Sequence, residues 1–199
     1  MSGPVTARAT GVGAWWEAIR RDRKATIGFA LIAGFLLMGV VGSWFVGDPD
    51  AMVGVPLQPP SSAHWLGTTG QGQDVVAQTV VGTRVSLLIG FGVGLMVVTI
   101  GALMGVAAGY FGGLVDSVLS LIINVFLVLP GLPLAIVIAA YLPAGPMTVA
   151  FVLVVTGWAW NARVLRAQTL MLRQRDFIAA ALVSGESHLR IITRELLPN

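Results

Sequence analysis

The sequence of 199 residues contains no cysteine and few charged residues. Without cysteine the chain cannot form disulfides, thiolate metal sites, iron-sulfur centres or a thiol nucleophile. Only 11 % of its residues are charged, whereas soluble domains carry about 25 %. In contrast, 56 % of the residues are hydrophobic and the mean hydropathy is +0.85. This composition excludes a soluble enzyme and a disordered chain, and it indicates a membrane protein.

Charged side chains are also missing where chemistry would need them. Lys24 is the only lysine and follows no glycine-rich turn, so the chain has no P-loop for ATP hydrolysis. No charged residue or histidine lies in the middle of an apolar stretch, which disfavours intrinsic proton or sodium coupling. His64 and His188 are separated by three apolar stretches and cannot share a metal ion. We therefore expect no catalytic residue, metal site or cofactor. We also expect no nucleic-acid partner, because membrane topology explains the basic residues.

Four stretches are long and apolar enough to cross a hydrocarbon core of about 30 Å as helices. They cover residues 25–47, 85–110, 117–142 and 144–162. The fold class is therefore an all-α, multi-pass transmembrane helical bundle.

The cations set the expected orientation of these spans. All arginines except Arg84, together with the lysine, lie in segments 1–24 and 163–199. Because cations in short loops stay on the cytoplasmic side, we expect both segments there and the first span to be a retained anchor. Residues 48–84 are then extracytoplasmic, with a short interfacial helix beginning near Asp74 that leads into the three-span core of residues 85–162.

Two features of the expected spans bear on a translocation pathway. Pro130 and Pro133 flank Gly131 and Leu132, and this cluster predicts a kink that either lines a pathway or is a static bend. Asn124 either bonds a neighbouring helix or touches a substrate. A separate series of glycines at four-residue spacing fits close helix packing, within the bundle or with a partner subunit. These are Gly101, Gly105 and Gly109.

Residues 176–199 predict a helix, a glycine turn and a second helix. Asp176 and Ser187 are suited to cap the two helices, and Gly185 fits the left-handed position after the first. Such a helical pair is either a docking element for a soluble partner or an amphipathic segment on the bilayer surface.

The same segment resembles the Glu-Ala-Ala signature loop in permease subunits of ABC importers for dipeptides, oligopeptides and nickel, specifically the dipeptide/oligopeptide permease C type. The matching positions are Ala180, Ala181, Gly185, Leu197, Pro198 and Asn199. Ala179 departs from the usual Glu, and Glu195 from a common His. Further matches lie at residues 64–87, 109–116 and 162–168, so the resemblance covers nearly the whole chain.

This resemblance implies a type I ABC importer permease fold in the bacterial plasma (inner) membrane, with a cytoplasmic N-terminus. The implied coupling residues to the ATPase are Ala180, Ala181, Gly185 and Glu186. The implied partners are a second permease subunit, two ATP-binding subunits that hydrolyse ATP, an extracytoplasmic substrate-binding protein and the lipid bilayer. The transported substrates would be di- or oligopeptides. Because such permeases usually have two more spans after the signature, the chain is expected to be truncated. A truncated, non-transporting membrane scaffold or assembly protein is the alternative.

Overall fold

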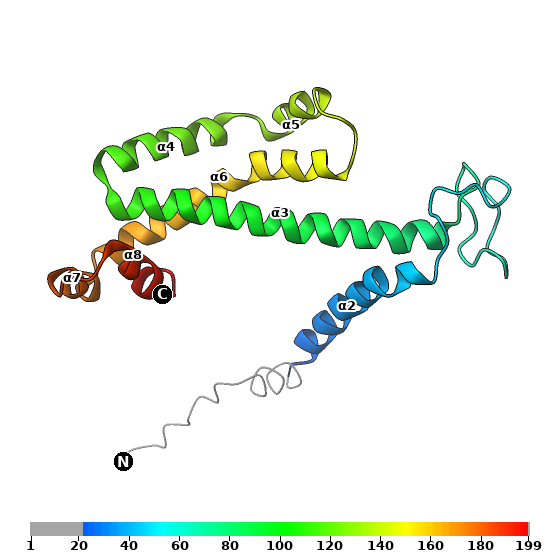
Figure 1. The fold of residues 1–199 in the computed structure, drawn as a ribbon, viewed down its shortest axis with the longest axis horizontal. Coiled ribbons are helices and arrows are strands. Elements are labelled where there is room, and N and C mark those ends of the chain that lie inside the picture. Colours follow the sequence, from blue (N-terminus) through cyan, green and yellow to red (C-terminus); the bar gives the residue numbers. More distant parts are fainter. Residues whose placement is uncertain (1–21, 199) are drawn as a thin grey trace, which may run out of the picture. The chain divides into compact units, whose positions relative to one another are not determined.

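A computed structural model describes residues 22–198. Most of the expected cytoplasmic segment 1–24 and the signature residue Asn199 lie outside this range. Within this range the chain is all-α and has two isolated β-bridges but no strand, which confirms the expected fold class. Figure 1 shows the arrangement of the helices. They are α2 (Arg23–Val40), α3 (Val75–Phe111), α4 (Gly113–Val128), α5 (Gly131–Ala140), α6 (Pro146–Arg173), α7 (Asp176–Val183) and α8 (His188–Ile191), with a 3₁₀ turn η1 (Gly42–Trp44) and a π-helical turn η2 (Ile192–Leu196).

The chain divides into two compact units, residues 1–87 and 88–199. In the first unit, α2 packs against the beginning of α3 through glycine. A Cβ at Gly39 would lie 3.2 Å from the Cα of Arg84, and one at Gly42 would lie 3.0 Å from a methyl group of Val80. Gly39 therefore allows the backbones of α2 and α3 to approach closely, and Gly42, in the turn η1, leaves room for the side chain of Val80.

Helix α3 is continuous over 37 residues, or about 55 Å. The expected interfacial helix and the expected span from residue 85 are therefore one helix in the structure. Asp74 begins it, because its carboxylate accepts hydrogen bonds from the backbone N–H groups of Val76 (2.7 Å) and Ala77 (3.0 Å). No proline interrupts the sequence after this cap, and an isolated Gly82 does not break a helix.

The second unit is organised around α6, which contacts both α4 and α5 (Figure 1). The glycine series of α3 packs on α6. A Cβ at Gly101 or Gly109 would lie 2.8 Å from the Cβ of Asn161 or 2.7 Å from the Cβ of Thr169, and one at Gly105 would overlap the carbonyl oxygen of Ala162. Of the two interpretations of this series, the structure supports packing within the bundle.

The proline cluster breaks the third apolar stretch as expected. Helices α4 and α5 meet at an angle of 87° around Pro130, which confirms the predicted kink. Pro133 is the third residue of α5, where a helix has no intrahelical partner for its N–H, so proline is tolerated there. In contrast, α6 does not end at residue 162 but continues to Arg173.

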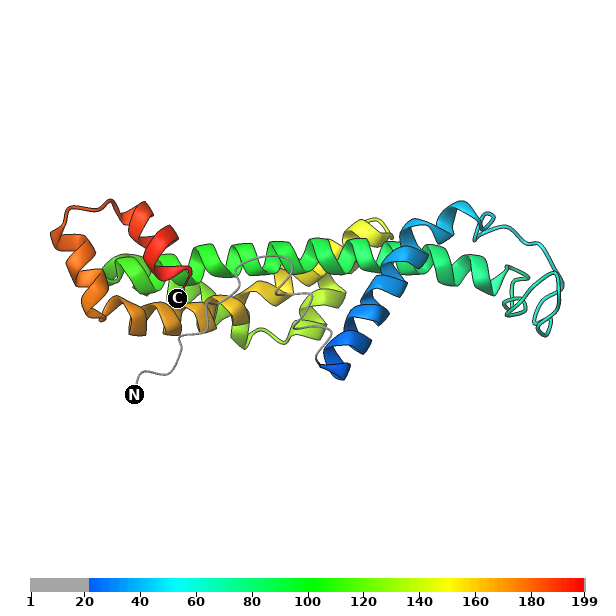
Figure 2. The same cartoon turned by 90° about the horizontal axis from the view of Figure 1, so that it is seen from below.

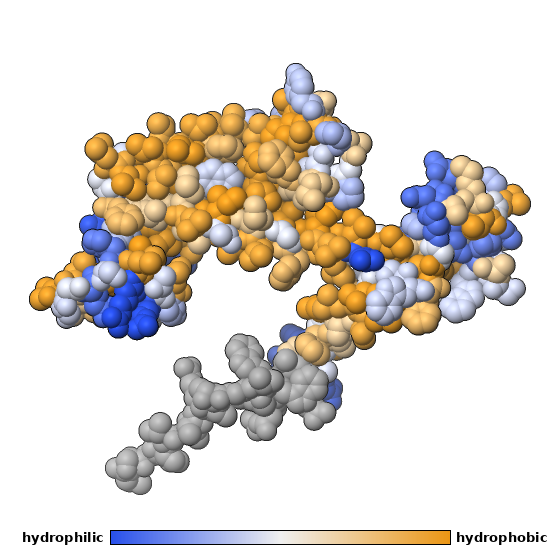
Figure 3. All heavy atoms as spheres, in the orientation of Figure 1, coloured by the Kyte–Doolittle hydropathy of each residue, from blue (hydrophilic) through white to orange (hydrophobic). Residues whose placement is uncertain are grey.

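Three of the described helices are long and apolar enough to cross a membrane, or four if the bent pair α4–α5 counts as one span. Many of their large side chains are exposed, such as Phe91 (78 %) and Leu121 (64 %). Figure 3 shows hydrophobic residues over α3–α6, whereas hydrophilic residues gather on the C-terminal helices and on the segment before α3. The apolar surfaces suit lipid or a partner subunit instead of water.

Candidate functional site

The first candidate region is the C-terminal helical segment, defined as residues 176–196 with α7, α8 and η2. Gly185 has a φ of +75°, which confirms the predicted left-handed turn between the helices. The observed helix caps differ in detail from the predicted ones. Arg175, not Asp176, is the N-cap of α7, and Asp176 lies in the first turn, where its charge still complements the helix dipole. Ser187 is the N-cap of α8 but makes no capping hydrogen bond through its side chain.

The four expected coupling residues lie together around this turn. Ala180 and Gly185 are exposed, whereas Ala181 is half-buried and packs against the core of the segment. One carboxylate oxygen of Glu186 lies 3.8 Å from Arg190, and the other is buried without a hydrogen-bond partner. Two large apolar side chains flank the turn and are largely exposed: Val183 (90 %) and Leu189 (73 %).

Tyr110, at the end of α3, anchors this segment. Its hydroxyl group is hydrogen-bonded to Nδ1 of His188 at 2.8 Å, and its ring packs edge-on against the imidazole. Tyr110 also belongs to a buried cluster with Ile178, Ile191 and Leu196. Figures 1 and 2 both place α8 beside the last turns of α3. The contact joins residues 78 positions apart, and no local sequence pattern signals such a pair.

The second candidate region is a set of polar contacts between α4 and α6. Arg166 donates two hydrogen bonds to Asp116, at 2.5 and 2.7 Å, and the hydroxyl of Ser120 donates a third at 2.9 Å. Further along α4, the Oδ1 atom of Asn124 accepts a hydrogen bond of 2.7 Å from Arg163. Asn124 therefore bonds a neighbouring helix, one of the two roles considered for it. Pro130 and Pro133 are exposed at the bend and lie outside these contacts.

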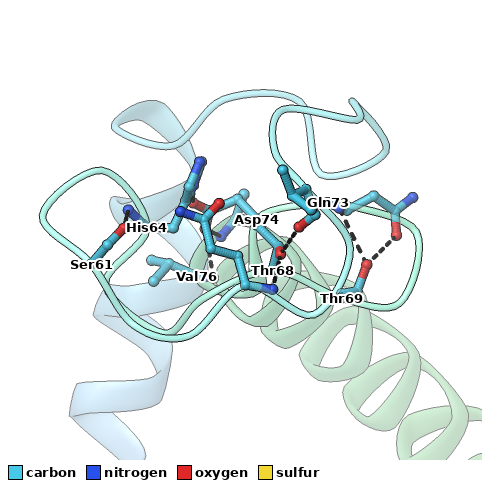
Figure 4. Close-up of polar contacts among 10 residues, drawn as sticks. Ser61, His64, Thr68, Thr69, Gln73, Asp74 and Val76 are labelled. Atoms are coloured by element: carbon cyan, nitrogen blue, oxygen red, sulfur yellow. Dashed lines mark hydrogen bonds and ion pairs between the residues drawn. The ribbon is translucent and has the colours of Figure 1, made fainter.

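The third region is the segment before α3, where polar side chains tie the loops together (Figure 4). Nδ1 of His64 lies 2.7 Å from a carboxylate oxygen of Asp74, the residue that caps α3. Thr68 accepts a hydrogen bond of 2.9 Å from the N–H of Gln58 and donates one of 2.5 Å to the carbonyl of Val55. Backbone hydrogen bonds add to these contacts, such as the one of 3.2 Å from the N–H of Val75 to the carbonyl of Gly67. Side-chain and backbone bonds together therefore hold the loops to the start of the helix.

This arrangement also shifts the acidity of Asp74. The hydrogen bond from His64, followed by that from the backbone N–H of Ala77, holds the pKa of Asp74 below its ordinary value. Both donors stabilise the charged carboxylate and outweigh its partial burial. The pairing of His64 with Asp74 is a structural finding, since sequence reasoning treated the two residues separately.

Among residues 22–198, no group of three or more His, Cys, Asp or Glu side chains is arranged to hold a metal ion. Apart from one carboxylate oxygen of Glu186, the polar side chains described above bond one another in pairs and small networks. The three regions are therefore an exposed helical turn, a set of polar contacts between two helices, and a loop segment held by hydrogen bonds.

A family profile and several similar proteins agree on the family to which the chain is related. The sequence profile described as "Binding-protein-dependent transport system inner membrane component" matches residues 98–199. The chain is 34 % identical over 188 residues to the dipeptide transport system permease protein DppC of Bacillus subtilis (strain 168), covering 92 % of this chain and 58 % of the relative. It is 39 % identical over 145 residues to the oligopeptide transport system permease protein OppC of Mycobacterium tuberculosis (strain H37Rv), covering 72 % and 50 %.

A third relative is aligned along the whole chain. The dipeptide transport system permease protein DppC of Alkalihalophilus pseudofirmus is 30 % identical over 203 residues, covering 100 % of this chain and 67 % of the relative. Across these three relatives, the chain spans between half and two thirds of the relative's length.

Proposed function

This chain belongs to the family of binding-protein-dependent transport system inner membrane components, and from that premise we propose that it is a transmembrane permease subunit of an ATP-driven importer. It forms part of the pathway for di- or oligopeptides, the substrates named for its relatives. Its apolar helices locate it in a membrane.

The observation that carries the proposal is the presentation of the Gly185 turn. The C-terminal helical segment is built on a buried core, yet Val183 and Leu189 remain largely exposed beside the turn. Exposed apolar side chains that are held in a fixed position suit a protein groove. We assign this groove to the ATP-binding subunit, with Ala180, Ala181, Gly185 and Glu186 at the contact.

The proposed topology follows from the cations. The N-terminus and residues 163–199 lie on the cytoplasmic side, where the latter meet the ATPase, and residues 48–84 lie on the opposite side. The first span covers residues 25–47, and the core of three spans lies within residues 85–162.

Energy and substrate come from partners in this proposal. The sequence has no P-loop lysine, so we place ATP hydrolysis in two ATP-binding subunits. A second permease subunit completes the pathway, and an extracytoplasmic binding protein delivers the substrate. Asn124 and the bend at Pro130 and Pro133 are the proposed pathway elements. Each proline lacks a backbone N–H group, and together they break the helix within an expected span.

The decisive experiment changes the conformation of the turn. In the complex assembled with its partners, Gly185→Val forces a β-branched residue into a left-handed conformation, at a cost of roughly 1–2 kcal/mol. We expect less peptide uptake per ATP hydrolysed in proteoliposomes. Gly185→Asn is the matched control, because asparagine tolerates this conformation and should retain uptake. Wild-type uptake per ATP by a fully assembled Gly185→Val complex would contradict the coupling role.

A second experiment tests the partners directly. The tagged chain is isolated from its native membrane in mild detergent, and bound proteins are identified by mass spectrometry. Recovery of an ATP-binding subunit and a second permease supports the proposal. Recovery of the chain alone, from a preparation in which other membrane complexes survive, overturns it in favour of a scaffold role.

A further inference from the structure

Two arginines on α6 lie three residues apart but have different partners. Arg166 is neutralised by Asp116 through two short hydrogen bonds. Arg163 is exposed and bonds only the neutral amide of Asn124, and among residues 22–198 it makes no ion pair. Among residues 22–198, Arg163 therefore meets no carboxylate and has N–H donors that bond no other group.

The direction of the Arg163 side chain is informative. From Asp116 to Asn124, α4 advances about 12 Å, whereas Arg166 and Arg163 are separated by only about 4.5 Å along α6. The Arg163 guanidinium must therefore reach toward the interior of the expected spans to meet Asn124. An arginine at the edge of a span ordinarily extends outward to water.

An exposed cation that is directed inward does not suit a lipid-facing surface. Hydrocarbon cannot bond its open donors, nor those of the exposed Asn124 amide. The face that carries both side chains must instead meet water or a polar group. Since guanidinium presents a planar fork of donors, the group it fits best is a carboxylate.

We propose that Arg163, positioned by Asn124, recognises the carboxylate of a peptide during its passage through the membrane. This rests on the proposed function, since a peptide with a free C-terminus carries such a carboxylate. The structure thus distinguishes a structural arginine, Arg166, from a substrate-contacting arginine, Arg163.

The test compares two substrates in the complete transporter. Uptake of a dipeptide with a free carboxylate and of the same dipeptide with a C-terminal amide is measured in proteoliposomes, with a binding protein shown to bind both. We expect Arg163→Gln to reduce the preference in kcat/KM for the acid by about tenfold, which corresponds to about 1.4 kcal/mol. Arg163→Lys should restore part of it because it keeps the charge. Arg23→Gln, on the exposed first turn of α2, removes an equal charge and should leave the preference unchanged.

A labelling measurement keeps the test valid if Arg163→Gln does not assemble. Because this chain has no cysteine, single cysteines introduced into it report on one position each. We expect Asn124→Cys to react with a membrane-impermeant thiol reagent, in complexes whose partner subunits lack reactive cysteines. Ile122→Cys, on the opposite face of α4, should not react.

The outcomes are distinguishable. An unchanged acid preference in a transporting Arg163→Gln complex overturns the inference, as does an Asn124→Cys that stays unlabelled in every nucleotide state. Failure of the wild-type complex to transport either dipeptide contradicts the proposed function instead.

Discussion

The packing of α3 on α6 predicts that a glycine-to-alanine substitution destabilises the protein more at one position of α3 than at another. A Cβ at Gly105 would overlap the carbonyl oxygen of Ala162 and lie 3.0 Å from the backbone nitrogen of Arg166, whereas one at Gly90 has no neighbour within 4 Å. Gly→Ala raises helix propensity by about 0.5–1 kcal/mol at either site, so that gain cancels in a comparison. The remaining difference is the cost of overpacking, about 1–3 kcal/mol.

This cost should fall at the upper end of the range, because the obstructing atoms belong to a helix backbone and not to a flexible side chain. Separating the helices also removes dispersion contacts along the interface. We expect purified Gly105→Ala in detergent to unfold about 6–12 °C below Gly90→Ala in a thermal scan. Equal midpoints for the two variants would show that the glycine interface does not hold α3 against α6.

Three further predictions concern side-chain bonds. Tyr110→Phe removes the hydroxyl bonded to His188 and should cost about 1 kcal/mol, detected as faster proteolysis of the C-terminal helical segment; unchanged proteolysis would contradict the anchoring role. A double-mutant cycle with Asp116→Asn and Arg166→Gln should give an interaction energy of about 1–2 kcal/mol, and a value near zero would refute a stabilising ion pair. Because the folded-state pKa of Asp74 is lowered, its contribution to stability is present above its ordinary value of 3.8 and is lost as pH falls through the folded value. Asp74→Asn should therefore flatten the acid limb of a stability–pH profile, and an unchanged limb would exclude this origin.

Some features of the fold follow from local sequence. The apolar stretches identify the membrane helices, the cluster around Pro130 predicts the bend, and Gly185 predicts the left-handed turn. Each of these signals is local in the sequence: the length of an apolar stretch, the missing N–H group of proline, and the small steric demand of glycine. Helix limits were less predictable: α3 begins at Val75, where hydropathy does not distinguish an interfacial helix from the start of a span.

The candidate sites depend on contacts between distant residues. His188 meets Tyr110 across 78 positions, and Arg163 meets Asn124 across 39. No spacing rule connects such residues, since their proximity follows from how the helices pack. The coupling and pathway roles of the expected residues stay predictions.

The unbroken course of α6 has a mechanical consequence. A rod of 28 residues is about 42 Å long, so a tilt of about 10° around its midpoint displaces each end by roughly 4 Å. The C-terminal end of α6 leads into the segment with the Gly185 turn, so such a tilt would also displace this turn. The size of the displacement depends on the length of α6 and not on the strength of any single bond. Because the glycines of α3 pack closely on α6, a tilt of α6 would also displace α3.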